Sequence, residues 1–251
     1  MKKILIFGGT TEQHALIERL AALPVKLTLS VASAYGRALL PEESDRLRVV
    51  TGRLDEAQMS DLLRAGGYCC VIDATHPYAV AVSANIRRAA ARLGLPALRL
   101  LRGHSDYADC LMVESSEQAV AELDKISGAV LLTIGSKELA RFTAMRDYQS
   151  RLYARVLPTA EALAICAEAG IAASHIIAMQ GPFSRELNLA LLRQFQIAAL
   201  VTKDGGAAGG FAQKLQAAQE LGVAVIVIRR PEESGLTETE LLRRISEIVE
   251  E

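Results

Sequence analysis

Short apolar runs alternate with amphipathic stretches over the first part of the chain. The runs that predict strands are residues 3–7, 26–31, 48–51, 69–74 and 96–100. Between them, apolar residues recur at helical spacing, as in residues 56–65 and after Tyr78. Most of the runs show no polar alternation, which is typical of a parallel sheet that helices cover on both faces. The pattern predicts a complete doubly wound domain.

The same pattern returns after residues 103–113, which break the period and which we interpret as the crossover into a second domain. Further strands are predicted at residues 129–134, 153–158, 175–180, 198–202 and 223–228. Thr237 is predicted to cap a last amphipathic helix. The predicted fold is α/β, with two doubly wound, Rossmann-like (flavodoxin-like) domains and mostly parallel sheets. We assign residues 1–102 to the N-terminal domain and 103–251 to the C-terminal domain, with strand ends facing each other across an interdomain cleft.

Composition narrows the range of ligands. Apolar residues make up 51% of the chain, enough for a substantial core. Only 4% are aromatic and there is no Trp, which argues against a stacking platform for nucleic acid, and a net charge of −1 argues against a general polyanion binder. Residues 1–102 are net basic and 103–251 net acidic. The basic half could favour a small anionic ligand, or the difference could be ordinary variation in surface charge.

The cysteines and histidines do not indicate a metal site. The four cysteines include no C-x-x-C pair and no Cys/His cluster, so neither a zinc site nor a disulfide framework is predicted. The four histidines fall on separate predicted elements, and His175 is best interpreted as structural. The N-terminus runs directly into a strand without a signal peptide, and no apolar run approaches the roughly 18 residues of a membrane span. We therefore expect a cytoplasmic protein without a membrane partner.

The stretch DATHPYA, at residues 73–79, begins at the end of the fourth predicted strand and continues beyond it. It places an Asp, a Thr, a His and a Tyr at the carboxyl end of that strand, where Pro77 stiffens the turn. Ligands of open α/β sheets bind at the carboxyl ends of strands, which favours a binding site here. The alternative is a strand followed by a helix that Thr75 or Asp73 caps.

Two other strand ends run into glycine turns, GGTTE at residues 8–12 and GSKEL at residues 135–139. In each turn, backbone N–H groups at the start of a helix could face an anion such as a phosphate. The dinucleotide signature G-x-G-x-x-G is absent, so these turns alone are a weak phosphate motif. No catalytic triad is visible, because Ser136 and Ser184 lack nearby histidines and no G-x-S-x-G motif occurs.

Basic side chains gather at strand ends in the second half, which suggests an anionic ligand. Lys203 is the strongest candidate, because it lies between a buried strand and the glycine loop at 205–210. It could bind a phosphate or carboxylate, or donate a proton. The alternative is a lysine that reaches solvent and pairs with Asp204. The loop glycines would let backbone N–H groups approach a ligand, or could serve turns and packing.

Several of these motifs together resemble one family, the precorrin-6A reductases of cobalamin (vitamin B12) biosynthesis, including the cobalt-precorrin-6A form. The matching stretches are residues 6–12, 73–79, 134–139, 181–183, 202–203 with the following glycines, and 229–231. DATHPY is the most specific of them, and residues 35–36 and 51–55 look more like the cobalt-containing branch. The chain departs from the family at His14, where an Arg is common, and at Gly205-Gly206, where Ser-Gly is usual.

The resemblance implies an oxidoreductase that acts on CH–CH groups of a tetrapyrrole. A nicotinamide dinucleotide, NADH or NADPH, would give a hydride to one ring double bond of (cobalt-)precorrin-6A and yield the dihydro (6B) intermediate. The substrate, which carries many carboxylates, could pass to or from other corrin-pathway enzymes. The alternative from another class is a non-catalytic two-domain nucleotide or small-anion binding or sensor protein. A sugar- or nucleotide-modifying enzyme would rest on fold analogy alone.

The resemblance also implies roles for individual residues. Lys203 would donate the proton or fix a neighbouring carboxylate, with Tyr78 and His76 lining the macrocycle. The residues expected at the cofactor are Gly8, Gly9, Thr10, Gly135, Ser136, Lys137, Gly205 and Gly206. The residues expected at the substrate are Arg37, Arg53, Asp73, Thr75, Pro77, Arg155 and Gly181. Arg37 could meet a 2′-phosphate of NADPH or a substrate carboxylate, and we favour the carboxylate.

Overall fold

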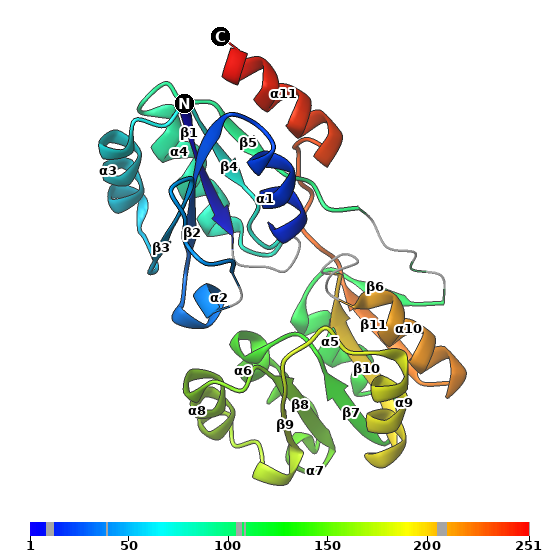
Figure 1. Ribbon diagram of the computed structural model, residues 1–251. Helices are drawn as coiled ribbons and strands as arrows, with labels where there is room; N and C mark the ends of the chain where they lie inside the picture. Colours follow the sequence, from blue (N-terminus) through cyan, green and yellow to red (C-terminus); the bar gives the residue numbers. More distant parts are fainter. Residues whose placement is uncertain (9–12, 39, 104–106, 108, 205–209, 251) are drawn as a thin grey trace. The chain divides into compact units, whose positions relative to one another are not determined.

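The computed structural model describes residues 1–8, 13–38, 40–103, 107, 109–204 and 210–250 (Figure 1). The chain divides into two compact units. The first consists of Met1–Gly103 and Pro231–Glu251, and the second of His104–Arg230. Among the described residues, no helix is long and apolar enough to cross a membrane.

The first unit is built on a five-stranded parallel sheet with the order β3-β2-β1-β4-β5. Its strands are β1 (Lys2–Gly8), β2 (Val25–Val31), β3 (Leu47–Thr51), β4 (Cys70–Asp73) and β5 (Ala97–Arg99). Its helices are α1 (Gln13–Ala21), α2 (Ala34–Ala38), α3 (Glu56–Gly66), α4 (Val80–Ala91) and α11 (Glu238–Glu250). All five strands were predicted, whereas the short helix α2 was not.

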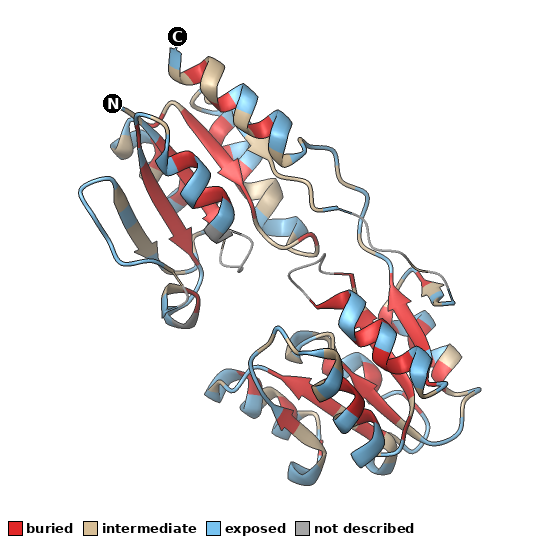
Figure 2. Cartoon of the chain, turned by 45° about the vertical axis from the view of Figure 1, so that its right-hand side comes forward, coloured by how far each residue is buried: buried red, intermediate tan, exposed pale blue. Residues whose placement is uncertain are grey.

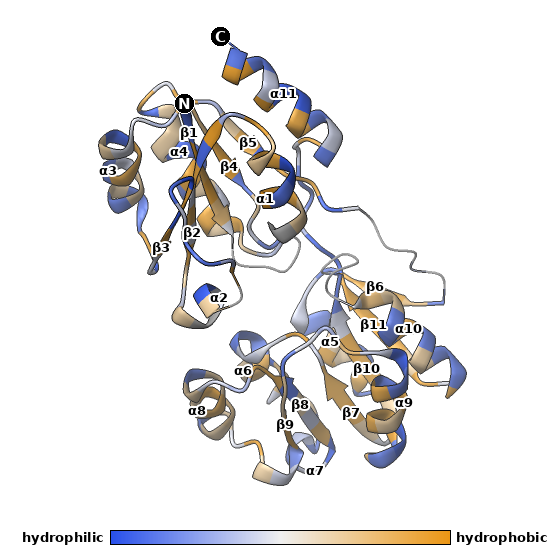
Figure 3. Cartoon of the chain, viewed as in Figure 1, coloured by the Kyte–Doolittle hydropathy of each residue, from blue (hydrophilic) through white to orange (hydrophobic). Residues whose placement is uncertain are grey.

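Helices cover both faces of this sheet, as the unbroken apolar strands predict. One apolar cluster joins the strands to α1 and α11, and another joins them to α3 and α4. The central strands are buried along most of their length (Figure 2), and Figure 3 shows the same strands as the most hydrophobic part of the unit. Burial on both faces removes apolar surface from water, which is the main driving force for this arrangement.

The C-terminal helix α11 belongs to the first unit, which corrects the predicted assignment of all of residues 103–251 to the second domain. Leu241, Ile245 and Ile248 lie on one face of α11 and are buried in the first domain's core. Leu236 pairs with Leu100, beside β5, and brings the chain back to the first sheet. The apolar stripe of α11 predicted a covered sheet face but could not identify which of two similar sheets it covers.

The second unit contains a six-stranded parallel sheet with the order β6-β11-β10-β7-β8-β9. Its strands are β6 (Leu111–Val113), β7 (Ala129–Leu132), β8 (Leu152–Val156), β9 (Ile176–Ala178), β10 (Ile197–Lys203) and β11 (Ala224–Ile228). Its α-helices are α5 (Ser116–Leu123), α6 (Leu139–Phe142), α7 (Tyr148–Arg151), α8 (Ala160–Glu168), α9 (Arg185–Gln194) and α10 (Phe211–Glu220), and its short 3-10 helices are η1 (Ser136–Glu138) and η2 (Ala173–His175). Strand β6 lies in the stretch interpreted only as a crossover and was not predicted.

Each sheet has one point where the order of its strands reverses. In the first sheet this point lies between β1 and β4, and in the second between β7 and β10. Ligands of doubly wound sheets bind at the carboxyl ends of the strands at such points. The fold therefore singles out residues after β1 and β4 in one domain, and after β7 and β10 in the other.

Candidate active site

The strand ends of the first sheet bring together residues that are far apart in the sequence. Gly8 ends β1 and pairs with Val31 of β2, while Phe7 pairs with Asp73 of β4. Because all of these strands are parallel, the segments that carry Arg37 and Arg53 also follow carboxyl ends at this edge. Arg37 is half-buried and pairs with Glu43, and Arg53 is exposed. Gly9 and Thr10 lie outside the described residues.

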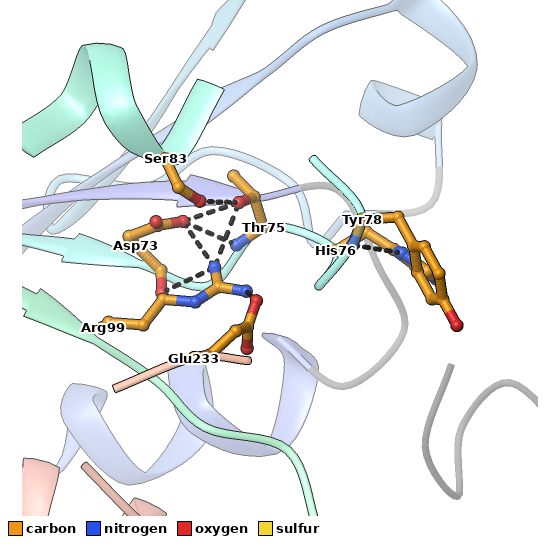
Figure 4. A network of polar contacts seen from close by, with 7 residues as sticks. All are labelled: Asp73, Thr75, His76, Tyr78, Ser83, Arg99 and Glu233. Carbon is orange, nitrogen blue, oxygen red and sulfur yellow. Dashed lines mark hydrogen bonds and ion pairs between the residues drawn. The ribbon is translucent and has the colours of Figure 1, made fainter. Parts of the chain in front are cut away.

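Asp73 is the centre of a buried polar network at the end of β4 (Figure 4). Its Oδ1 accepts hydrogen bonds from the backbone N–H and the hydroxyl of Thr75, at 3.0 and 2.6 Å. The Arg99 guanidinium reaches the same oxygen at 2.8 Å and bonds Glu233 at 2.7 Å with its other end. Thr75 Oγ1 also lies 3.2 Å from Ser83 Oγ. These bonds satisfy a carboxylate that burial would otherwise destabilise.

This network corrects the predicted helix cap. Helix α4 begins at Val80, and its N-cap residue Ala79 makes no side-chain capping bond. Asp73 and Thr75 lie too early in the chain to cap it, and they shape the turn after β4 and tie it to β5 and to the returning C-terminal segment. The alternative interpretation, in which Thr75 or Asp73 caps the helix, is therefore wrong.

His76 and Tyr78 extend from the same turn. Their ring centroids are 5.4 Å apart, and the Tyr78 N–H donates to His76 Nδ1 at 3.4 Å. Both side chains are partly exposed, whereas Pro77 between them is buried and fixes the turn. The turn therefore presents an imidazole and a phenol side by side at the carboxyl edge of the sheet (Figure 4).

Arg99 and Glu233, which hold the DATHPYA turn in place, were not predicted as site residues. A cavity of about 570 Å³ adjoins them, with Asp73, Pro77 and Ser83 also in its lining. An arginine closing a short apolar strand was the one available signal for Arg99. Glu233 follows the RRP motif but comes from a segment assigned to the other domain, so no sequence pattern indicated that it lies here.

In the second sheet, the turn after β7 approaches the end of β10. Gly135 has a φ of 81°, a conformation that favours glycine, and a Cβ built on it would meet no atom within 4 Å. Ser136 and Lys137 follow in η1, with Lys137 exposed. This turn thus leaves open space beside its backbone.

Lys203 ends β10 with its side chain 17% exposed, and its ammonium lies 3.5 Å from Glu138 Oε1. Glu138 is itself held in place, because its Oε2 accepts from Ser116 Oγ at 2.9 Å and lies 3.2 Å from Arg141 Nε. Asp204, the expected alternative partner, is buried and accepts a hydrogen bond from the Tyr107 hydroxyl. Gly205 and Gly206, which come next, lie outside the described residues.

Arg155 is buried in the second domain, against the loop that contains Gly181. Its guanidinium donates to Asn188 Oδ1 at 2.8 Å and lies 4.1 Å from the centre of the Phe183 ring. Burial lowers the pKa of Arg155 to about 10. Gly181 packs tightly, since a Cβ there would come within 3.0 Å of the Phe183 ring. The described contacts give Arg155 a role in holding this loop, and its predicted contact with a substrate carboxylate stays a prediction.

Comparison with known proteins decides the family. The family model described as "Precorrin-6x reductase CbiJ/CobK" matches residues 3–251. The chain belongs to the precorrin-6x reductase family. The family resemblance inferred from the motifs is therefore confirmed, and it extends over both domains.

Relatives in the precorrin-6x reductase family are similar over nearly the whole chain. The cobalt-precorrin-6A reductase of Salmonella typhimurium is 39% identical over 232 residues, which cover 91% of this chain and 87% of that protein. The cobalt-precorrin-6A reductase of Methanothermobacter thermautotrophicus is 35% identical over 234 residues, which cover 91% of this chain and 76% of that protein. A solved structure described as CobK precorrin-6A reductase matches with a TM-score of 0.80 and 28% identity, covering 99% of this chain and 98% of that one. This match confirms the predicted α/β fold class.

Within the described ranges, no group of three or more His, Cys, Asp or Glu side chains could hold a metal ion. The polar groups at the strand ends are instead suited to binding anions and moving a proton. Among the described residues, hydroxyl-bearing side chains follow β4, a glycine turn follows β7, and a lysine ends β10.

Proposed function

We propose that the protein is a nicotinamide-dependent reductase that adds a hydride and a proton across one ring double bond of (cobalt-)precorrin-6A, giving the dihydro (6B) product. The observation that carries this proposal is the family match across both sheets, with DATHPYA and Lys203 at the reversal point of one sheet each. Relatives named cobalt-precorrin-6A reductase support the substrate.

A nicotinamide dinucleotide fits the glycine turns. We propose that the backbone of Gly8, Gly135 and Ser136 approaches its phosphates and that Lys137 adds a charge. Gly135 supports this because its left-handed φ and the open space beside it leave room for a ligand. Once bound, the cofactor supplies the hydride. The protein's part is to orient the two reactants, exclude water and deliver the proton.

For the proton we propose Lys203. Its ammonium is mostly enclosed and is oriented by Glu138, which Ser116 and Arg141 hold in turn. A general acid at a fixed position contributes on the order of 100-fold or more to a rate. His76 and Tyr78 would line the macrocycle, and Arg37 and Arg53 would bind its carboxylates, bidentately where geometry allows. Asp73 and Thr75 would act by holding the turn on which His76 and Tyr78 stand.

The decisive experiment supplies purified protein with precorrin-6A, with and without cobalt, and with NADH or NADPH. We expect loss of the reduced nicotinamide absorbance and a product with two additional hydrogen atoms. Lys203→Ala should lower kcat by about 100-fold or more without loss of dinucleotide affinity. Dinucleotide binding without oxidation of any cofactor would contradict a reductase and favour a binding or sensor protein. Normal turnover by Lys203→Ala would exclude Lys203 as the proton donor.

A further inference from the structure

A lysine is buried in the second domain beside the carboxyl end of β10, the strand that ends at Lys203. Lys214 lies in the first turn of α10 and is 7% exposed. Its ammonium donates a hydrogen bond to Thr202 Oγ1 at 2.8 Å. Lysines are almost never buried unless they are paired, because moving the ammonium out of water is costly. The proposed reductase chemistry gives this residue no direct part.

The two groups on which Lys214 acts flank Lys203 in the sequence. Thr202 accepts the hydrogen bond from Lys214, and its own hydroxyl donates to the Lys203 carbonyl at 3.2 Å. Asp204, which is buried, attracts the Lys214 charge. Lys214 thus acts on the residue before Lys203 and on the residue after it.

Strand alternation explains how Lys214, through Thr202 and Asp204, sets the direction of the Lys203 side chain. Successive side chains of a strand point to opposite faces of the sheet. Leu200 belongs to the apolar cluster beneath α9 and α10, so Thr202 and Asp204 project toward the same helices. Lys203 then projects to the other face, where Glu138 lies 3.5 Å from its ammonium. Holding Thr202 and Asp204 on the α10 side therefore keeps Lys203 directed away from it.

Burial and two neighbouring charges act on the Lys214 ammonium in opposite directions. Burial, and secondly the positive charge of Arg155, lower the pKa of Lys214 to about 7 against the opposing effect of the Asp204 carboxylate. The Tyr107 hydroxyl donates to Asp204, and burial followed by this bond raises the pKa of Tyr107 to about 12. Electrostatic interactions inside a protein are stronger than in water, so each group here influences the others.

We propose that Lys214 is a positioning residue of the reductase, which holds Thr202 and Asp204 on the α10 side of the sheet and so fixes the direction of the Lys203 ammonium. The proposal rests on the proposed function, in which Lys203 delivers the proton. Lys214 does not reach the reactants, and it acts through the backbone and the neighbours of Lys203. Small errors in the position of a reacting group cost on the order of 100-fold in rate, which gives such a support a measurable effect.

Two variants of the full chain test this by kinetics. Lys214→Met keeps the length of the side chain without its charge, and Thr202→Val removes the hydroxyl that connects Lys214 to the Lys203 carbonyl. Each should lower kcat on the order of 10- to 100-fold with little change in KM for the dinucleotide, and the double variant should be no worse than the poorer single one, because the two residues act as a unit. The matched control is Lys125→Met, an exposed lysine of the same domain, which should keep wild-type kcat.

A second measurement does not depend on catalysis. With isotope-labelled lysine carbonyl carbons, the Lys203 resonance in nuclear magnetic resonance spectra should move with pH around neutrality in the wild type and stay constant in Lys214→Met and in Thr202→Val. If the wild type fails to oxidise a nicotinamide cofactor with precorrin-6A, the proposed function fails, and this titration alone decides the connection. If Lys214→Met does not fold, Thr202→Val decides it. Wild-type kcat in Thr202→Val, or a Lys203 carbonyl that titrates unchanged in either folded variant, would overturn the proposal.

Discussion

Arg99 and Asp73 end the neighbouring strands β5 and β4 and form an ion pair of 2.8 Å, with side chains only 11% and 4% exposed. Asp73 and Arg99 are partners in the register of these parallel strands, so the ion pair joins the two strand ends at the start of the DATHPYA turn. Arg99 also bonds Glu233 of the returning C-terminal segment. One guanidinium thus connects the DATHPYA turn to a part of the chain that is remote in sequence.

Removing this guanidinium should destabilise the first domain. Arg99→Met leaves Asp73 and Glu233 as carboxylates without their cation, and breaking a buried pair in this way costs about 3–5 kcal/mol. Hydrogen exchange of the β4 amides in the full chain would measure the change in free energy of opening. Arg64→Met, which breaks an exposed pair with Asp61, is the control and should cost about 1 kcal/mol or less. Equal losses in the two variants would contradict the structural role of Arg99.

Local patterns predicted the strands well because each is a short apolar run that must be buried on both faces. The same patterns could not predict partners. Nothing in the amphipathic spacing of α11 specifies the first sheet, and nothing in residues 96–100 shows that Arg99 pairs with Asp73, since that depends on strand register. Lys214 occupies a helix position like that of any surface lysine, and only the packing of α10 onto β10 shows that it is enclosed.

The same distinction between local patterns and tertiary partners applies to the site residues. Motif and strand end together predicted where Lys203 and the DATHPYA turn would lie, because the carboxyl ends of parallel strands share an edge. Asp204 was the alternative partner considered for Lys203. Strand alternation directs Asp204 to the opposite face, and the Lys203 ammonium lies near Glu138 instead. Sequence spacing does not show which helices and strands lie on each face of β10 until the order of the strands is known.

Glu138 should matter to catalysis through Lys203. Glu138→Gln keeps the size and the bond to Ser116 but removes the charge that orients the ammonium, so kcat should fall by about 10-fold or more while dinucleotide affinity stays within about 2-fold. Steady-state kinetics and binding of the dinucleotide would separate the two effects. Glu117→Gln changes the exposed partner of the same Arg141 and serves as the control. A loss in affinity with unchanged kcat would show that Glu138 contacts the cofactor instead.

The assignment of α11 to the first domain can be tested by stability. Ile245 is fully buried in the cluster that includes Ile4 and Leu16, so Ile245→Ala should destabilise by about 2–5 kcal/mol. Hydrogen exchange should show faster opening of β1 and β2, while β7 and β10 keep wild-type protection. Arg243→Ala, on the exposed side of the same helix, is the matched control and should change little. Lost protection in β7 and β10 alone would place α11 on the second sheet.

The buried ammonium of Lys214 should make stability depend on pH in a particular direction. Its pKa is lowered from 10.5 to about 7, so between these values the unfolded chain binds more protons than the folded one. Stability therefore rises with pH across that window, by up to about 1.4 kcal/mol per pH unit, and the penalty for burying the charge is fully present below it. Lys214→Met lacks this contribution. The unfolding free energy of the wild type should therefore rise relative to that of the variant between pH 7 and pH 10. Urea unfolding at a series of pH values measures that difference, with Lys125→Met as the control that shows no such slope. A difference that is constant with pH would mean that Lys214 keeps an ordinary pKa in the folded protein.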